Sequence, residues 1–258
     1  MLALLSLCLH PGDALSPRDF VEQHARQHGL QSAYTVLPVR HGRMLDFPFH
    51  LRRLALSLNQ LTATKSGARS IGRSHQLEYA VSRALAPWYE ESRSGFLTLC
   101  AVITARGEPL VDVLFTPSET VPGLPSSQPL MGIAVDTAVY KRGNSAAKYS
   151  DWTLERKPLE INRRSGATET LLIETTTSTA LLLEGLTSNV FVIENGELVT
   201  AADGVLQGSM AHLLLQHCRN LGVPLALRKP CIADAHQWTA VFLTSALDIT
   251  IAPMMQIP

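Results

Sequence analysis

The sequence has no net charge and few cysteines, and these shortages narrow what the protein can do. Its 22 basic residues balance its 22 acidic residues, so no large field is available to attract nucleic acid or an anionic membrane surface. Its four cysteines form no CxxC pair, lack zinc-site spacing and are too few for a disulfide scaffold. We therefore expect a small-molecule ligand and reduced thiols in an intracellular protein, either cytoplasmic or in an organelle such as a plastid.

Long apolar runs and the common catalytic motifs are also missing. The opening MLALLSLCLHPGDALSP has only a short apolar stretch with no basic residue before it, which predicts neither a secretory signal nor a membrane span. HExxH, P-loop, GxGxxG and GxSxG motifs are absent. His24 and His28 lie at helical spacing without a third ligand nearby in the sequence, so we expect a solvated helix face and no metal.

Apolar residues, by contrast, make up 46% of the 258 residues, which is enough for the core of one large domain or of two ordinary ones. Caps and apolar periodicity predict helices over about 17–28, from 46 to about 61 and from 74 to about 87. Strands are predicted between them and on both sides of Gly107. Residues 116–130 hold four prolines and no apolar period, which predicts a linker. We expect an α+β protein with a smaller N-terminal domain over 1–117, a linker over 118–130 and a larger C-terminal domain over 131–258.

The second half is dense in predicted strands. After a strand at MGIAVDTAVY and a polar turn, we expect a helix that starts near Lys148 and is limited by Pro158. VFVI and ELVT flank Asn195-Gly196, a strong hairpin signal because both turn residues tolerate positive φ. A helix opened by Gly208 and closed at Gly222 follows, and TAVFLTS is the expected final strand.

Two charged residues stand out against apolar or small neighbours. Glu184 follows an apolar run, and it is either a solvated acid or a buried one that needs a cation or a hydrogen-bond network. A cationic ligand atom is one candidate partner. Lys148 is either an ordinary exposed lysine or a reactive amine. A helix start and burial would both disfavour its ammonium form. The neutral amine could then attack a carbonyl.

The remaining candidates suit an anion. Arg53 is either a solvated helix arginine or a bidentate phosphate clamp. Gly208, Ser209 and Met210 form either an ordinary helix start or a set of backbone N–H groups facing a phosphate. Thr244 and Ser245, at the end of the last expected strand, are equally ambiguous hydroxyls.

Taken in order, these pieces resemble the class IV aminotransferases. That family of fold-type IV pyridoxal-phosphate enzymes includes branched-chain and D-amino-acid aminotransferases and aminodeoxychorismate lyase. The resemblance extends from about Ala33 to the C-terminus, and its most specific part is EGLTSN followed by a hairpin. The matching segments are HLRRLALSLNQL (50–61), AAK (146–148), LLLEGLTSNVFVIENGELVTA (181–201), VLQGSMAHLLLQHC (205–218) and VFLTSAL (241–247).

The resemblance implies a homodimer with the D-amino-acid-aminotransferase-like fold. Each chain would have an N-terminal α/β sandwich and a C-terminal pseudo-barrel, with pyridoxal 5'-phosphate in the cleft between them. Lys148 would hold the cofactor as a Schiff base and shuttle the substrate proton, and Glu184 would pair with the pyridine nitrogen. The phosphate would be bound by Arg53, Gly208, Ser209, Met210 and Thr244 or Ser245, and the turn that aims Glu184 would be shaped by Ser188 and Asn189.

The implied reaction is amino transfer between an amino acid and a 2-oxo acid. Two alternatives remain: elimination of the aminodeoxychorismate-lyase type, and a cofactor-binding or interaction protein without turnover. Thr153 stands five residues beyond Lys148, where the branched-chain enzymes carry a tyrosine. Tyr34, Tyr149 and Tyr140 are therefore the candidates to contact the cofactor's phenolic oxygen.

Overall fold

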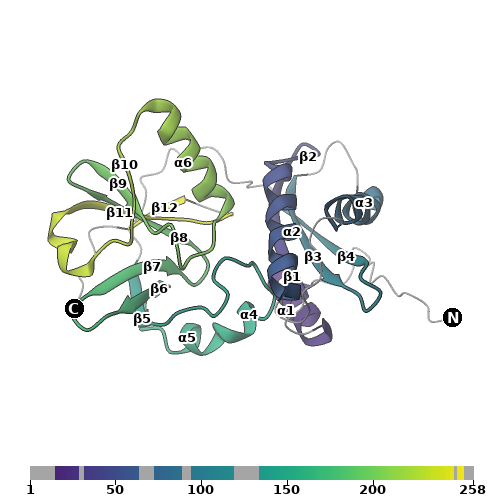
Figure 1. The fold of residues 1–258 in the computed structure, drawn as a ribbon, viewed down its shortest axis with the longest axis horizontal. Coiled ribbons are helices and arrows are strands. Elements are labelled where there is room, and N and C mark those ends of the chain that lie inside the picture. The colour runs from purple at the N-terminus through teal and green to yellow at the C-terminus, as the bar shows by residue number, and fades with distance from the viewer. Residues whose placement is uncertain are drawn as a thin grey trace. The chain divides into compact units, whose positions relative to one another are not determined.

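The described residues of the computed structural model form two compact units (Figure 1). The structure describes residues 15–28, 32–63, 73–88, 94–118, 134–246 and 249–252. One unit comprises Met1–Val121 with Ala147–Glu155, and the other comprises Pro122–Ala146 with Arg156–Pro258. The segment that carries Lys148 therefore lies in the first unit, whereas a division at residues 118–130 leaves it in the second half. Most of the expected linker, and the N-terminal segment, lie outside the described residues.

The first unit is built on a four-stranded antiparallel sheet. Across the sheet its strands are β2 (Arg43–Met44), β1 (Ser32–Arg40), β3 (Gly95–Ile103) and β4 (Pro109–Pro117). Its helices are α1 (Pro17–His28), α2 (Phe47–Ala63), α3 (Arg73–Leu85), a short 3-10 helix (Ala86–Trp88) and α4 (Trp152–Glu155). The helices predicted over 17–28, 46–61 and 74–87 are thus confirmed to within a few residues.

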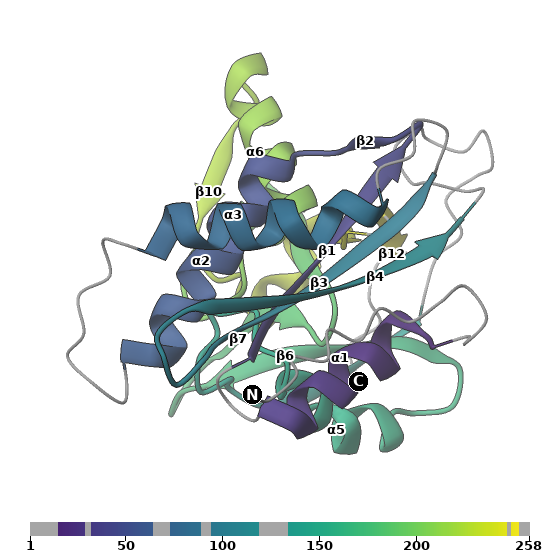
Figure 2. The same cartoon turned by 90° about the vertical axis from the view of Figure 1, so that its right-hand side faces the viewer.

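Helices cover both faces of this sheet, as Figure 2 shows with α1 on one face and α2 and α3 on the other. Phe20 and Val21 of α1 pack on Tyr34 and Cys100, whose side chains share one face of β1 and β3. The alternate face of β1 meets α2, where Thr35 contacts Arg53. Side chains at alternate positions of β1 therefore face different helices, and residues from both faces of the strand belong to the candidate site.

The second unit is built around a larger mixed sheet. Across it the strands run in the order β10 (Leu225–Leu227), β9 (Glu197–Thr200), β8 (Asn189–Glu194), β7 (Ala180–Gly185), β6 (Ala167–Thr175) and β5 (Ala134–Val139). β11 (Trp238–Thr244) pairs with β8 along its whole length and with β12 (Ile249–Ala252). The helices are α5 (Lys157–Ile161), α6 (Ser209–Leu221) and a 3-10 helix (Ile232–Gln237).

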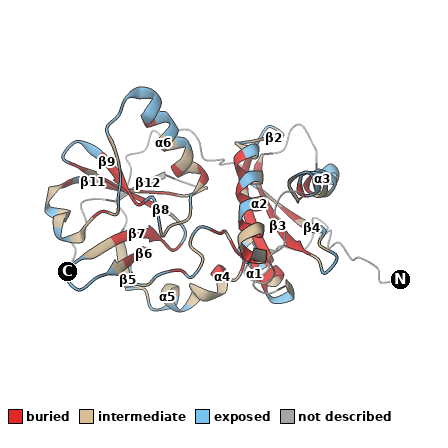
Figure 3. Cartoon of the chain, viewed as in Figure 1, coloured by how far each residue is buried: buried red, intermediate tan, exposed pale blue. Residues whose placement is uncertain are grey.

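Strand β8 lies at the centre of this sheet and is buried on both faces (Figure 3). Val190 and Val192 pack with Leu182 and Val241 on one face, whereas Phe191 packs with Ala211 of α6 on the other. Phe191 also stacks on Phe242 with ring centroids 5.5 Å apart. This doubly packed strand is a rigid base for the polar residues at its first end.

Local sequence signals predicted most of the helices, strands and turns of the second half. The hairpin at Asn195 and Gly196 is confirmed, with φ of 51° and 81°, and α6 begins after Gly208 and ends at Gly222 with φ of 69°. TAVFLTS is a strand, but it is not the last one because β12 follows it. Pro158 lies in the first turn of α5 rather than ending a helix, since its missing N–H is tolerated there. None of the described helices is long and apolar enough to cross a membrane.

Candidate active site

Lys148 lies in an extended segment that runs beside β1. Its carbonyl accepts a hydrogen bond from Tyr34 N–H (2.9 Å), and the N–H of Ser150 donates to the carbonyl of Ser32 (2.9 Å). Between them, Tyr149 forms an antiparallel bridge with Ala33. These bonds fix the backbone on both sides of the lysine.

The prediction that a helix starts near Lys148 is wrong. Helix α4 begins only at Trp152, because the polar backbone groups around residue 148 are already bonded to β1. No helix N-terminus therefore lies at Lys148 to disfavour its ammonium form. Its half-buried side chain instead places Nζ 4.6 Å from the ring centroid of the buried Tyr34.

A single serine ties this lysine to Arg53. Ser57 of α2 accepts a hydrogen bond from Lys148 N–H (2.9 Å), and its hydroxyl donates to the carbonyl of Arg53 (2.9 Å). Ser57 is fully buried, and Arg53 is only 7% exposed. The spacing between the lysine backbone and the turn of α2 that carries Arg53 is therefore set inside the first unit.

Arg53 is a buried cation. Its Nη2 donates to Thr35 Oγ1 (2.8 Å) and lies 3.4 Å from Nδ1 of His50, while its guanidinium lies 5.2 Å from the Phe49 ring centroid. Burial lowers the pKa of Arg53 to about 10, so the group remains charged near neutral pH. The alternative of a solvated helix arginine is thus excluded.

His50 beside it is held neutral. Burial first, and then the charges of Arg53 and Lys148, lower the pKa of His50 from 6.5 to about 3. The hydrogen bonds agree, because Thr35 Oγ1 accepts from Arg53 and can therefore donate its own proton to His50 Nδ1 (2.8 Å). An uncharged imidazole next to the guanidinium avoids a second buried positive charge.

Glu184 is buried in the second unit at the end of β7, and it is 3% exposed. Its Oε1 accepts from Nη1 of Arg142 (3.0 Å), a residue that is itself 4% exposed, and its Oε2 accepts from Leu206 N–H (2.9 Å). The expectation that a buried acid needs a cation and a hydrogen-bond network is met by the protein itself.

The loop after Glu184 is organised by a second buried acid, Glu169 of β6. Its Oε2 accepts from Thr187 N–H (3.2 Å), Thr187 Oγ1 (2.7 Å) and Ser188 Oγ (3.0 Å). A Cβ at Gly185 would lie 2.3 Å from Ser188 Oγ and 2.9 Å from Glu169 Oε2, so a larger residue there would force these side chains to move. The side chain of Ser188 therefore shapes the turn by bonding to Glu169.

Asn189 holds the loop that leads into α6. Its Nδ2 donates to the carbonyl of Leu206 (2.6 Å), and its Oδ1 accepts from Gly208 N–H (3.1 Å). A Cβ at Gly208 would lie 2.1 Å from that Oδ1, so the close approach requires glycine. The loop from Leu206 to Gly208 is thus fixed to both Asn189 and Glu184 before it enters α6.

The first turn of α6 has the character of an anion site. Its cap residue Gly208 has no side chain to bond the N–H groups of the first turn, which begins with the buried Ser209 and the partly buried Met210. Thr244 pairs with Asn189 across β11 and β8, and Asn189 pairs with Glu184 across β8 and β7. Thr244 is 1% exposed, and its hydroxyl has no hydrogen-bond partner among the described residues.

The candidate residues thus fall into two groups. Lys148 and Arg53 are tied together in the first unit. In the second unit, the register of three strands and the loop into α6 bring together Glu184, Ser188, Asn189, Gly208, Ser209, Met210 and Thr244, with Ser245 directly after Thr244.

Sequence reasoning missed four polar residues that organise these groups: His50, Ser57, Arg142 and Glu169. Each looks like an ordinary surface residue in the sequence, and each is buried against a partner far away along the chain. Arg142, six residues before Lys148, stands in a polar turn where exposure is the usual expectation. Of the three candidate tyrosines, Tyr149 donates its hydroxyl to Glu155 (2.7 Å).

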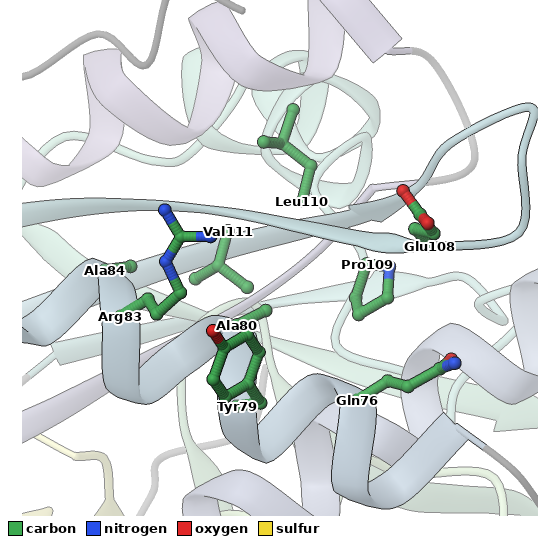
Figure 4. A pocket seen from close by; sticks show the side chains of 9 residues that line it. All are labelled: Gln76, Tyr79, Ala80, Arg83, Ala84, Glu108, Pro109, Leu110 and Val111. Atoms are coloured by element: carbon green, nitrogen blue, oxygen red, sulfur yellow. The ribbon is translucent and has the colours of Figure 1, made fainter.

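A separate pocket of about 570 Å³ lies in the first unit between α3 and the start of β4 (Figure 4). Tyr79 and Arg83 project from the helix, with the guanidinium 5.9 Å from the ring centroid, and Leu110 and Val111 line the strand side. The pocket includes none of the candidate residues.

Comparisons with known proteins agree with the resemblance in the sequence. The family model described as "Amino-transferase class IV" matches residues 32–257. A sequence search found no match among curated proteins.

Solved structures share the fold at low sequence identity. The 4-amino-4-deoxychorismate lyase of Pseudomonas aeruginosa matches with a TM-score of 0.67 and 20% identity, covering 87% of this chain and 83% of that one. A branched-chain aminotransferase of Thermoproteus uzoniensis matches with a TM-score of 0.66 and 17% identity, covering 89% and 82%. A hypothetical aminotransferase of Mycobacterium tuberculosis in its PLP-bound form matches with a TM-score of 0.64 and 20% identity, covering 95% and 86%.

Proposed function

This chain belongs to the class IV aminotransferase family, whose members are pyridoxal-phosphate-dependent enzymes, and from this we propose that it binds pyridoxal 5'-phosphate through Lys148. The proposed reaction moves an amino group between an amino acid and a 2-oxo acid. The observation that carries the proposal is the link from Lys148 through Ser57 to Arg53. It fixes the spacing between the backbone positions that carry an amine and a buried cation, and a ligand with an aldehyde and a phosphate needs both groups.

The residues of both units fit this cofactor chemically. Arg53 supplies a buried cation for the phosphate, and α6 supplies an N-terminus whose glycine cap leaves its first N–H groups without a side-chain cap. The buried hydroxyl of Thr244 is a further donor that a phosphate oxygen would satisfy. We propose that Ser209, Met210 and Ser245 complete the set of residues that bind the phosphate.

Glu184 would hold a proton on the pyridine nitrogen. Arg142 at 3.0 Å holds one oxygen of the carboxylate, and the Leu206 N–H holds the other. Arg142 is thus a positioning residue for Glu184. The family resemblance implies one cofactor for Lys148 and Glu184, and we propose that both residues hold it.

When bound, the cofactor supplies an aldehyde for attachment and a ring that accepts electrons from the substrate carbon. The chain's own residues do the rest. The amine of Lys148, once displaced by the substrate amine, would take the proton from the substrate carbon that bears nitrogen and deliver it to the cofactor carbon that had carried the aldehyde oxygen. Tyr34 lines the approach to that amine, since its ring lies 4.6 Å from Nζ.

A borohydride experiment with matched variants tests cofactor binding. We expect purified protein with added pyridoxal phosphate to be yellow, and borohydride to remove the colour and leave the added mass on Lys148. Lys148→Ala should lose the adduct. Arg53→Ala should weaken cofactor binding by more than about tenfold, since it removes a charged phosphate contact, whereas the exposed neighbour Arg52→Ala should not. A protein that stays colourless would refute the proposal and favour an interaction protein of the same fold.

A single-turnover assay separates amino transfer from elimination. Cofactor-loaded protein mixed with a panel of L- and D-amino acids should convert to the pyridoxamine form and release a 2-oxo acid. Pyruvate release from an amino-chorismate-type substrate without that conversion would instead assign the lyase reaction. We also propose a homodimer, as the family resemblance implies, which sedimentation equilibrium would test.

A further inference from the structure

Two histidines that look solvated in the sequence meet a carboxylate in the fold. His24 and His28 lie one turn apart on α1, with ring centroids 4.6 Å apart, and Asp112 of β4 faces them. One ligand atom of each of the three residues lies within 4.8 Å of the other two. The expectation of a solvated histidine face is therefore wrong for His24, which is 3% exposed. Asp112, the potential third ligand, is distant from both histidines in the sequence.

We propose that His24, His28 and Asp112 form a zinc-binding site that clips α1 to β4. Two imidazoles and one carboxylate are a donor set that Zn²⁺ prefers, with water as the fourth ligand. The i, i+4 spacing of the histidines on one helix face is the spacing that a shared metal requires.

The distances suit a tetrahedral ion. Zinc bonds of about 2.0–2.1 Å place neighbouring ligand atoms roughly 3.3–3.4 Å apart. His24 Nε2 and Asp112 Oδ2 lie 3.3 Å apart. His28 is only half-buried, and a ring rotation that moves its nitrogen by up to about 1.4 Å would complete the triangle.

His24 is already oriented as a metal ligand. Its Nδ1 shares a hydrogen bond with Ser32 Oγ, which in turn lies 2.8 Å from Ser150 Oγ. Such an outer hydrogen bond fixes the ring and leaves the other nitrogen for the metal. That nitrogen, Nε2, is buried and makes no hydrogen bond of good geometry within the described part of the chain.

Cobalt spectroscopy on the untagged full-length chain, after chelator treatment and without added cofactor, tests the site. Co²⁺ replaces Zn²⁺ and gives a visible absorption when its coordination is tetrahedral. We expect the absorption to saturate at one Co²⁺ per chain, and Zn²⁺ to displace it and raise the melting temperature.

Variants assign the ligands. His28→Gln and Asp112→Asn should each weaken binding by more than about tenfold, whereas His217→Gln, an exposed histidine on α6, should leave it unchanged. His28 is half-buried and Asp112→Asn keeps its shape, so neither variant depends on the deeply buried His24. Absence of the band in folded wild-type protein, or unchanged affinity in both variants, would overturn the site. Lys148→Ala should still bind the metal, so this result is independent of the proposed enzymatic function.

Discussion

The buried pair of Arg142 and Glu184 makes a quantitative prediction about stability. Both side chains are nearly inaccessible, 2% and 4% exposed, so neither charge can return to water when its partner is removed. Removing one member of such a pair costs about 3–5 kcal/mol. In Arg142→Met the carboxylate keeps its bond to Leu206 N–H, so we expect the lower end, about 3 kcal/mol.

Urea unfolding followed by far-UV circular dichroism measures this loss, and Arg164→Met is the matched control. Arg164 pairs with Asp136 at the same distance of 3.0 Å, but its side chain is 56% exposed. Such a surface pair contributes about 0–1 kcal/mol. The contrast between the two arginines therefore isolates the effect of burial.

A double-mutant cycle tests whether the loss comes from an uncompensated charge. Glu184→Gln leaves Arg142 buried without its anion, and we expect a loss similar to that of Arg142→Met. Combining the two should restore at least about 1.5 kcal/mol relative to the sum, because both charges are then gone. Additive losses within about 0.5 kcal/mol, or an Arg142→Met variant as stable as the control, would refute the reasoning.

Three further results are expected. The pKa of His50 is about 3 in the folded protein and 6.5 in the unfolded chain, so the unfolded chain binds a proton first as the pH falls. The free energy of unfolding should therefore fall by up to about 1.4 kcal/mol per pH unit below pH 6.5. A His50→Gln variant whose free energy of unfolding depends on pH as steeply as that of the wild type between about pH 7 and pH 5 would contradict this. Gly208→Ala places a Cβ 2.1 Å from Asn189 Oδ1, so urea unfolding should show a loss of about 1–3 kcal/mol; wild-type stability would show that the loop is loose. Glu169→Gln should cost about 0.5–1.5 kcal/mol, because a glutamine offers one acceptor oxygen instead of two and loses hydrogen bonds to the partly buried turn. Faster amide exchange at Thr187 should accompany the loss.

The sequence predicted those elements whose signals are local. Ser16 accepts from Asp19 N–H at the start of α1 (3.1 Å), and Asn195 and Gly196 adopt positive φ at their hairpin, so in both cases nearby residues determine the structure. Burial was one of the two alternatives for Glu184, and the apolar residues directly before it favour that alternative.

What could not be predicted depends on pairing between distant segments. The extended conformation at Lys148 is imposed by hydrogen bonds to β1, which override the local preference for a helix start. Likewise, Arg142 reads as a turn residue until the fold places it against Glu184, and His24 reads as solvated until β4 brings Asp112 to it. In each case the deciding partner lies far away in the sequence.

The central claim is that Lys148 and Glu184 act on one cofactor ring. Nitrogen-15 NMR of ring-labelled pyridoxal phosphate, reduced onto the chain with borohydride, tests it most directly. We predict that the label is attached at Lys148 and that its ring nitrogen is protonated near neutral pH in the wild-type chain but not in Glu184→Gln. A label attached elsewhere, or a ring nitrogen whose chemical shift is the same in both proteins, would contradict the account.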